Sequence, residues 1–560
     1  MITLTIDGKS IQTEAGRSVI EAARENGIEI PHFCWHPRLS VAGNCRMCLV
    51  EVEKMPKLAI ACATLVSEGM VVHTTTPRVI DAREAVMEFL LINHPLDCPI
   101  CDEAGECKLQ DYAYKYGTGQ SRFEEDKVHK PKRVTLGPHV MLDVERCIMC
   151  SRCVRFCDEV AKKPQLTFTE RGDHVVLTTF PGQQLDNPYS MNVIDICPVG
   201  ALTSREFRFH ARVWEMSSTE SVCPGCARGC NMNIWVRNNE ILRQTPRTNM
   251  DVNKDWMCDA GRLETMKEVG RDTRIKSPRI KSHDVLKEAS WDEALASVAS
   301  ELKVFRRSEI ALLGSARATV EDNFVLQKFA REALGTKFVD AVMHVQPGTG
   351  DDILIHEDKA PNGRGALEVG VRSHDPAMGF EGILRGIKER RIKSLLIMDD
   401  DIACDPQVAT LLDMLEYLVV LSPSENSTTK MADAILPCST YAERNGTFVN
   451  ADGRVQRIRP AVALIDQDRA LDGYAQSRLD RFGTTFDRWG RGGKRDARPS
   501  WRILTGIAAA MGTKYRYGTA EDVFAEVAST IPSFRGMSYR KLGNKGLLLL
   551  EAKSVQAVAV

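Results

Sequence analysis

The cysteines of this chain are concentrated in its first half. All but two of its 18 cysteines lie between Cys34 and Cys258, and the other two are Cys404 and Cys438. In a reducing compartment, clustered cysteines bind metal or carry electrons more often than they form disulfides. The chain opens with an alternating apolar pattern over residues 1–7, which predicts a strand and not a secretory signal. Disulfides are therefore the less favoured alternative.

The composition excludes some classes of function. The chain has 560 residues, of which 43% are hydrophobic and 27% charged, with a formal net charge of −1. This is typical of a globular protein with several domains. Without a basic excess, a nucleic-acid partner is not expected. No uninterrupted apolar run of about 18 residues is present, so we expect no direct insertion into a membrane.

The cysteine spacing points to iron–sulfur clusters. A cluster needs several thiolates around iron; short turns supply two or three, and a distant residue completes the set. The chain shows this pattern four times, and we number the ligand sets in chain order. They are Cys34, Cys45, Cys48 and Cys62; His94, Cys98, Cys101 and Cys107; Cys147, Cys150, Cys153 and Cys197; and Cys223, Cys226, Cys230 and Cys258.

The cysteine spacing does not decide which metal the first and fourth sets bind. The first has the spacing C-x10-C-x2-C-x13-C, and the fourth has C-x2-C-x3-C-x27-C. A small β-rich context favours [2Fe–2S] for the first set. Structural zinc remains the alternative for both.

The second set has only three cysteines, which cannot supply four ligands. His94 lies just upstream and precedes Pro95, where the chain turns back. A lone histidine is more often not a ligand, so spacing alone does not decide whether His94 binds the metal. If it is a ligand, a neutral imidazole removes one negative charge from the site and changes its potential.

The third set contains a ferredoxin-type run. Cys147, Cys150 and Cys153 have [4Fe–4S] spacing, and Cys197 followed by Pro198 is a typical closing residue. Cys157 extends the run to a pattern that, in two-cluster ferredoxins, donates to the other cluster. No second three-cysteine run accompanies Cys197, so a free buried thiol is the favoured interpretation of Cys157.

Hydrophobic periodicity predicts small domains first and a larger α/β domain later. From about residue 282, helices alternate with short apolar strands, which predicts a largely parallel sheet. Residues 119–140 are predicted to be a charged linker, and residues 465–500 a solvated loop or lid. The individual elements expected are a hairpin of residues 1–7 and 10–14, helices over 17–25, 83–92 and 108–116, and strands over 59–65 (with Cys62), 71–75, 309–313, 394–398 and 417–421.

The order of the four sets resembles a known family. It is similar to the G subunit of bacterial NADH:quinone oxidoreductase, respiratory complex I, whose mitochondrial counterpart is the 75-kDa iron–sulfur subunit. The stretch from Cys197 to Ser204 also resembles that family, and the likeness covers about residues 1–272. The resemblance implies that His94 is a ligand, and that the chain holds one [2Fe–2S] and three [4Fe–4S] clusters.

The later part resembles molybdopterin oxidoreductases such as formate dehydrogenase. The similar residues are 435–450 and 453–456. Those enzymes are longer here and often bind molybdenum through a cysteine, whereas neither Cys404 nor Cys438 lies in such a motif. A shortened domain with a scaffold role and no molybdopterin is therefore expected.

Together these patterns predict a multidomain α+β and α/β protein. The expected domains are a β-grasp [2Fe–2S] ferredoxin domain (1–78), a [4Fe–4S] domain with one histidine and three cysteines (79–118), a ferredoxin-like [4Fe–4S] domain (138–215), a molybdopterin-oxidoreductase-type [4Fe–4S] domain (216–272) and a shortened molybdopterin-oxidoreductase-like α/β domain (273–560).

The resemblance also implies function and partners. No G-x-G-x-x-G or Walker A motif is present, so NADH binding is expected on a partner. The chain would relay single electrons from an NADH/flavin-binding subunit toward cluster-bearing subunits nearer quinone, in the peripheral arm on the cytoplasmic face of the inner membrane. The whole complex would translocate protons. The alternative is an electron-transfer subunit of a cytoplasmic NAD-linked hydrogenase or formate dehydrogenase. A zinc-stabilised scaffold without a redox role is a further alternative, from a different class of function.

Overall fold

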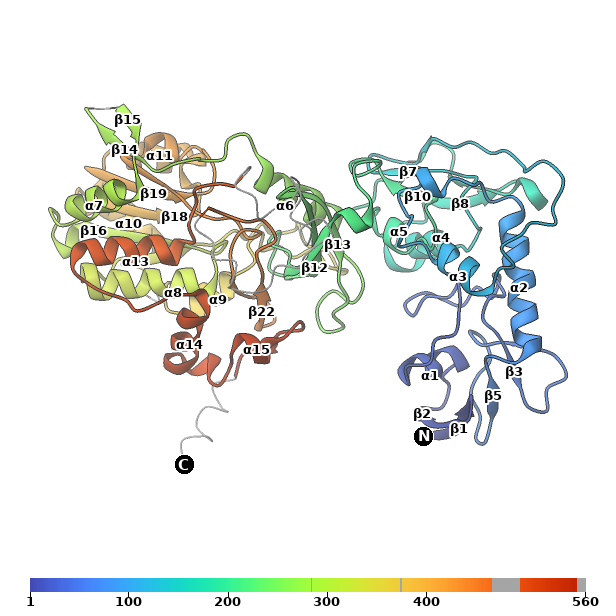
Figure 1. Ribbon diagram of the computed structural model, residues 1–560. Helices are drawn as coiled ribbons and strands as arrows, with labels where there is room; N and C mark the ends of the chain where they lie inside the picture. Colours follow the sequence, from blue (N-terminus) through green and yellow to red (C-terminus); the bar gives the residue numbers. More distant parts are fainter. Residues whose placement is uncertain (284, 373–374, 466–493, 551–560) are drawn as a thin grey trace. The chain divides into compact units, whose positions relative to one another are not determined.

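A computed structural model describes residues 1–283, 285–372, 375–465 and 494–550 (Figure 1). The chain divides into two compact units, Met1–Trp214 and Glu215–Val560, which are described separately. Most of the predicted lid at 465–500 lies outside the described residues. Within the described ranges, no helix is both long enough and apolar enough to cross a membrane.

The first unit begins with a five-stranded sheet of order β2-β1-β5-β3-β4. The predicted hairpin is confirmed, since β1 and β2 pair antiparallel, while β1 and β5 pair parallel. Helix α1 packs Val19 and Ile20 against the buried face of this sheet. The elements are β1 (Ile2–Ile6), β2 (Lys9–Thr13), α1 (Val19–Glu25), β3 (Leu49–Val52), β4 (Ala59–Ile60) and β5 (Val71–His73).

The predicted strand over residues 59–65 is wrong beyond Ile60. The backbone N–H groups of Ala63 and Thr64 both donate to the carbonyl of Ile60, at 3.1 Å each. These turn hydrogen bonds end the strand, so Cys62 lies in a turn and not on a strand. Strand β3 was not predicted, because its four residues directly follow the Cys48 loop.

The rest of the first unit consists of short elements around two long helices. Helix α2 begins after Thr76, whose side chain accepts a hydrogen bond from Val79 N, and is longer than predicted. Helix α3 has the predicted bounds. The elements are α2 (Pro77–Ile92), α3 (Lys108–Tyr116), β6 (Val134–Thr135), β7 (Val140–Leu142), α4 (Arg152–Arg155), η2 (Phe156–Val160), β8 (Leu166–Thr169), β9 (Val176–Thr179), α5 (Asn192–Asp195) and β10 (Leu202–Ser204). Strand β6 lies inside the predicted linker.

The second unit opens with a three-stranded antiparallel sheet and helix α6. Strands β11 (Ser217–Val222), β12 (Asn231–Arg237) and β13 (Glu240–Pro246) form the sheet. Helix α6 (Asp259–Gly270) begins at Cys258, whose sulfur accepts a hydrogen bond from Gly261 N.

A seven-stranded sheet forms the core of the second unit, in the order β15-β14-β20-β19-β18-β16-β17. Its middle strands are parallel and fully buried, as predicted. Helices cover both faces. The elements are β14 (Arg279–Ser282), β15 (Val285–Glu288), α7 (Trp291–Leu302), β16 (Ile310–Ser315), α8 (Val320–Lys328), β17 (Val339–Val342), α9 (Gly363–Glu368), α10 (Phe380–Lys388), β18 (Ser394–Met398), α11 (Pro406–Leu412), β19 (Tyr417–Ser422), β20 (Ala434–Pro437), β21 (Gly446–Val449), β22 (Arg454–Ile458), α13 (Ser500–Met511), α14 (Ala520–Thr530), α15 (Tyr539–Leu542) and β23 (Leu547–Leu548).

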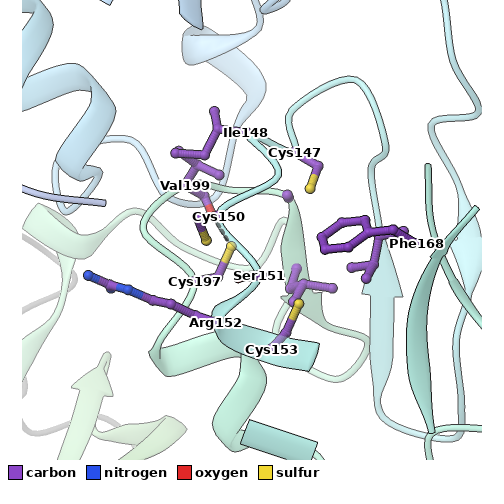
Figure 2. A pocket seen from close by; sticks show the side chains of 12 residues that line it. Cys147, Ile148, Cys150, Ser151, Arg152, Cys153, Phe168, Cys197 and Val199 are labelled. Carbon is purple, nitrogen blue, oxygen red and sulfur yellow. Dashed lines mark hydrogen bonds between the residues drawn. The ribbon is translucent and has the colours of Figure 1, made fainter. Parts of the chain in front are cut away.

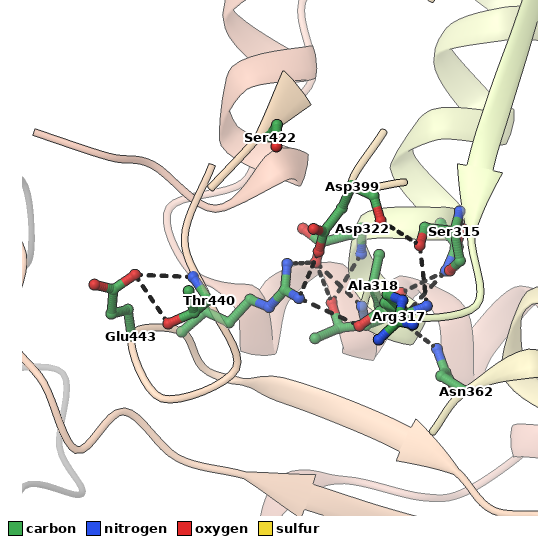
Figure 3. A network of polar contacts seen from close by, with 12 residues as sticks. Ser315, Arg317, Ala318, Asp322, Asn362, Asp399, Ser422, Thr440 and Glu443 are labelled. Atoms are coloured by element: carbon green, nitrogen blue, oxygen red, sulfur yellow. Dashed lines mark hydrogen bonds and ion pairs between the residues drawn. The ribbon is translucent and has the colours of Figure 1, made fainter. Parts of the chain in front are cut away.

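A network of polar contacts that includes Ser315, Asp322 and Asp399 lies where the strand order reverses, between β16 and β18 (Figure 3). Ligands of such α/β sheets bind at this point, outside the carboxyl ends of the strands. Here Ser315 Oγ, at the end of β16, donates to Asp399 O, just after β18, at 2.9 Å. Arg444 Nη1 lies 3.1 Å from Asp322 Oδ2, and its Nη2 lies 3.2 Å from Asp399 Oδ2. The ends of these strands thus carry a buried ionic network of the chain itself.

We predict that Arg444→Met destabilises the second unit by about 3–5 kcal/mol, because it leaves two buried carboxylates without their cation. The matched control is Arg391→Met, which removes an exposed pair with Glu389 and should cost about 1 kcal/mol or less. Differential scanning calorimetry of the full chain measures both. Equal losses of stability in the two variants would contradict the role assigned to the network.

Candidate iron–sulfur sites

The thiols of the first set lie in two close pairs. The Cys34 and Cys45 thiols share a hydrogen bond, and so do those of Cys48 and Cys62. Within each pair the hydrogen bond lowers the pKa of one thiol, Cys34 or Cys62, and raises that of its partner. A [2Fe–2S] cluster has two irons and takes four thiolates. These four thiols would supply the donors that such a cluster takes.

The second set surrounds a small cavity of about 20 Å³. His94 follows the end of α2, and the cysteines follow in the loop before α3. Burial, then the charges of Arg146 and Lys127, lower the pKa of His94 to about 4. The imidazole is therefore neutral at physiological pH, which is the form that binds metal. The residues lining this cavity include His94, Cys98, Cys101, Cys107, Gln110, Arg146 and Gly200.

The third set surrounds a cavity of similar size (Figure 2). Cys147, Cys150 and Cys153 come from one loop and the start of α4, and Cys197 follows α5. Phe168, on β8, closes one side. Met149 and Ser151 have φ of 54° and 61°, a left-handed conformation uncommon for such residues, which lets three thiols turn inward from one short loop. Cys157 is fully buried but is not among the described residues that line this cavity.

The fourth set lines a larger cavity of about 340 Å³ in the second unit. Backbone N–H groups already point at its sulfurs, since Gly225 N donates to Cys223 Sγ at 3.4 Å and Gly261 N to Cys258 Sγ at 3.3 Å. A Cβ atom at Gly261 would lie 3.1 Å from the sulfurs of both Cys223 and Cys258. Only glycine therefore fits there without crowding the ligands.

Within the first unit, the loops of the third set contact those of both other sets. Toward the first set, Arg155 Nη2 donates to Cys34 O at 2.5 Å, and Asn44 Nδ2 donates to Met149 O at 3.1 Å. Toward the second set, Lys108 N donates to Pro198 O at 3.1 Å. The loops that carry the three sets are thus in direct contact.

Gly200 is a point of close approach between the second and third sets. It lies three residues after Cys197, and a Cβ atom built on it would be 2.2 Å from Cys101 Sγ. Gly200, Gly261 and Arg146 were not predicted from the sequence as part of any site. Their importance comes from contacts between segments far apart in the sequence, and no spacing pattern indicates such contacts.

The four predicted sets are thus each brought together around a cavity or as close pairs, and thiolates with a neutral imidazole are the donor chemistry that iron–sulfur clusters use. In the part of the chain that the structure describes, no group of three or more His, Cys, Asp or Glu residues has the geometry of a site for a single metal ion. The assignment of each residue as a ligand stays a prediction.

Comparison with known families defines the class of protein. Five family profiles match: the 2Fe-2S iron-sulfur cluster binding domain (1–77), the NADH-ubiquinone oxidoreductase-G iron-sulfur binding region (83–122), the ferredoxin-like domain of NADH-quinone oxidoreductase subunit 3 (137–203), the molybdopterin oxidoreductase Fe4S4 domain (216–265) and molybdopterin oxidoreductase (274–363 and 365–470). The chain is thus similar to ferredoxin-type and Fe4S4 cluster-binding domains and to molybdopterin oxidoreductases, and the predicted fold class is confirmed.

The chain is homologous to the G subunit of NADH-quinone oxidoreductase. The G subunit from Rickettsia bellii is 46% identical over 59% of this chain and 48% of its own length. The 75 kDa subunit of the NADH-ubiquinone oxidoreductase from Reclinomonas americana is 45% identical over 55% of this chain and 44% of its own length. The G subunit from Streptomyces coelicolor is 40% identical over 71% of this chain and 47% of its own length. The chain spans about half the length of these relatives. The family resemblance predicted from the motifs is confirmed.

A solved structure of an NAD+-reducing [NiFe]-hydrogenase also matches. It is 32% identical over 38% of this chain and 91% of that chain, with a TM-score of 0.34.

We predict that Cys197→Ser removes one [4Fe–4S] centre, whereas Cys157→Ser keeps all of them. Cys197 lines the cavity of the third set and Cys157 does not. Iron content should fall by about four per chain in the first variant only. The two variants control for each other, because both replace a cysteine in the same domain. The reverse result would show that Cys157 closes the site.

Proposed function

We propose that the chain is the iron–sulfur electron-transfer subunit of an NADH:quinone oxidoreductase. It would hold one [2Fe–2S] cluster at the first set and [4Fe–4S] clusters at the other three. When bound, these groups accept and donate single electrons. The chain itself supplies the ligands, the burial and the spacing between sites.

The observation that carries this proposal is the contact between three ligand loops in one folded unit. Residues of the third set's loops bond directly to those of the first set and to those of the second set. Electron transfer between centres requires such proximity, whereas separate zinc-stabilised modules do not. The homology to the G subunit and to the 75 kDa subunit supports the same assignment.

The partners follow from the proposed function. An NADH/flavin-binding subunit would deliver electrons, and cluster-bearing subunits nearer quinone would receive them. The chain would belong to the peripheral arm, on the cytoplasmic face of the membrane, and proton translocation would be a property of the whole complex. The fourth set would be peripheral to this relay.

The domain of residues 273–560 is proposed to be a scaffold. At the strand ends where related folds hold a ligand, this chain has Arg444 paired with Asp322 and Asp399. This supports the expectation that no molybdopterin is bound.

The test of the proposed function is iron and acid-labile sulfide content, with low-temperature EPR of the dithionite-reduced full chain. We expect about 14 iron per chain, with both [2Fe–2S] and [4Fe–4S] signals. About 10 iron would mean that one four-iron site, such as the fourth set, holds no cluster. Little iron with abundant zinc would contradict electron transfer and favour a structural role.

A further inference from the structure

Arg146 is a buried cation with an unused hydrogen-bond donor. It directly precedes Cys147, and its side chain is only 3% exposed. Its Nε and Nη2 donate to Asp97 Oδ2, at 3.3 and 2.9 Å. Its third nitrogen, Nη1, is buried and has no partner in the structure. Leaving a buried N–H group without a partner is unfavourable, so the position of Nη1 calls for a physical reason.

The unpaired nitrogen belongs to a side chain in the wall of the second set's cavity. Arg146 lines that cavity together with His94, Cys101 and the other two cysteines. Its charge interacts with both Cys101 and His94. Among the described residues that line the cavity, Arg146 is the only lysine or arginine.

Two carboxylates hold the guanidinium in place. Asp97 lies between His94 and Cys98 in the sequence, and accepts two hydrogen bonds from Arg146. Asp143, itself 3% exposed, has Oδ2 at 3.2 Å from Arg146 Nε. Both contacts involve Nε and Nη2, which leaves Nη1 free for a further acceptor. A planar guanidinium fixed on one edge holds its other nitrogen in a defined direction.

We propose that Arg146 tunes the redox potential of the second site, with Nη1 donating a hydrogen bond to a sulfur of the cluster bound there. The inference rests on the proposed function, because it requires a cluster at the second set. Each electron that enters the site adds one negative charge, and no bond forms or breaks. A buried positive charge stabilises that reduced state more than the oxidised one, so Arg146 raises the midpoint potential.

The location also makes this effect specific. Arg146 belongs to the segment that leads into the third set, but it lines the cavity of the second set and is not among the described residues that line the third. Removing its charge should therefore change the midpoint potential of the second centre more than that of the third. A general loss of packing would not separate the two centres in this way.

The test is an EPR-monitored redox titration of the full chain for Arg146→Gln and Arg146→Lys. The second centre is first assigned as the signal that His94→Cys alters. For Arg146→Gln we expect the ratio of reduced to oxidised centre, at a fixed solution potential, to fall about tenfold, which is about 59 mV for one electron. Arg146→Lys keeps the charge but lacks the planar guanidinium with its fixed N–H directions. Its midpoint potential should therefore shift in the same direction by a smaller amount. The control is Arg133→Gln, which removes an exposed arginine from the same segment and should leave the midpoint potential of the second centre unchanged.

Iron and sulfide content separates failure of this inference from failure of the proposed function. If the unmodified chain holds no cluster at the second set, the proposed function fails. If Arg146→Gln keeps the cluster and its potential is unchanged, only the inference fails. Loss of the cluster from both Arg146 variants would also overturn it, because the residue would then be structural. Loss from the glutamine variant alone, with retention in the lysine variant, would support the need for a positive charge.

Discussion

The burial of cysteine thiols is the constraint on which the rest of this structure depends. Desolvation raises the pKa of Cys153, Cys197, Cys223 and Cys230 well above the usual value for a thiol. Buried thiols of this kind do not ionise alone, and a metal group supplies the positive charge that makes thiolates stable. Folding and cofactor binding are therefore expected to be coupled, most of all in the first unit, whose strands and helices around the third set are only two to five residues long.

The same constraint accounts for the backbone around the sites. Loops that turn several thiols inward contain left-handed residues such as Met149 and Ser151, and glycines where a Cβ would clash with a sulfur, as at Gly200, or crowd two sulfurs, as at Gly261. Arginines then link the loops: Arg155 donates to Cys34 O, and Arg146 binds Asp97 beside His94. In the second unit, Arg444 stabilises the strand ends of the large sheet in a comparable manner, by pairing with two buried carboxylates.

Much of this could be predicted from the sequence, because local patterns determine it. Helix α3 and strand β18 have the predicted bounds. Cysteine spacing and the family resemblance are enough to propose the four ligand sets, whose role as ligands stays a prediction. The strand predicted through Cys62 failed because a turn hydrogen bond to Ile60 O competes with the sheet ladder. Gly200 and Arg146 were not identifiable, since each acts on a residue dozens of positions away, Cys101 and Asp97 respectively.

The central claim is that the third site lies close enough to the other sites of its unit, the first included, to interact with them. Pulsed EPR on the reduced full chain tests this most directly, by measuring the spin-lattice relaxation of the [2Fe–2S] centre with and without the third centre. We predict faster relaxation in the unmodified chain than in Cys197→Ser, because a neighbouring paramagnetic centre is lost in the variant. Identical relaxation in the two proteins, with the third centre reduced in the unmodified chain, would contradict this claim.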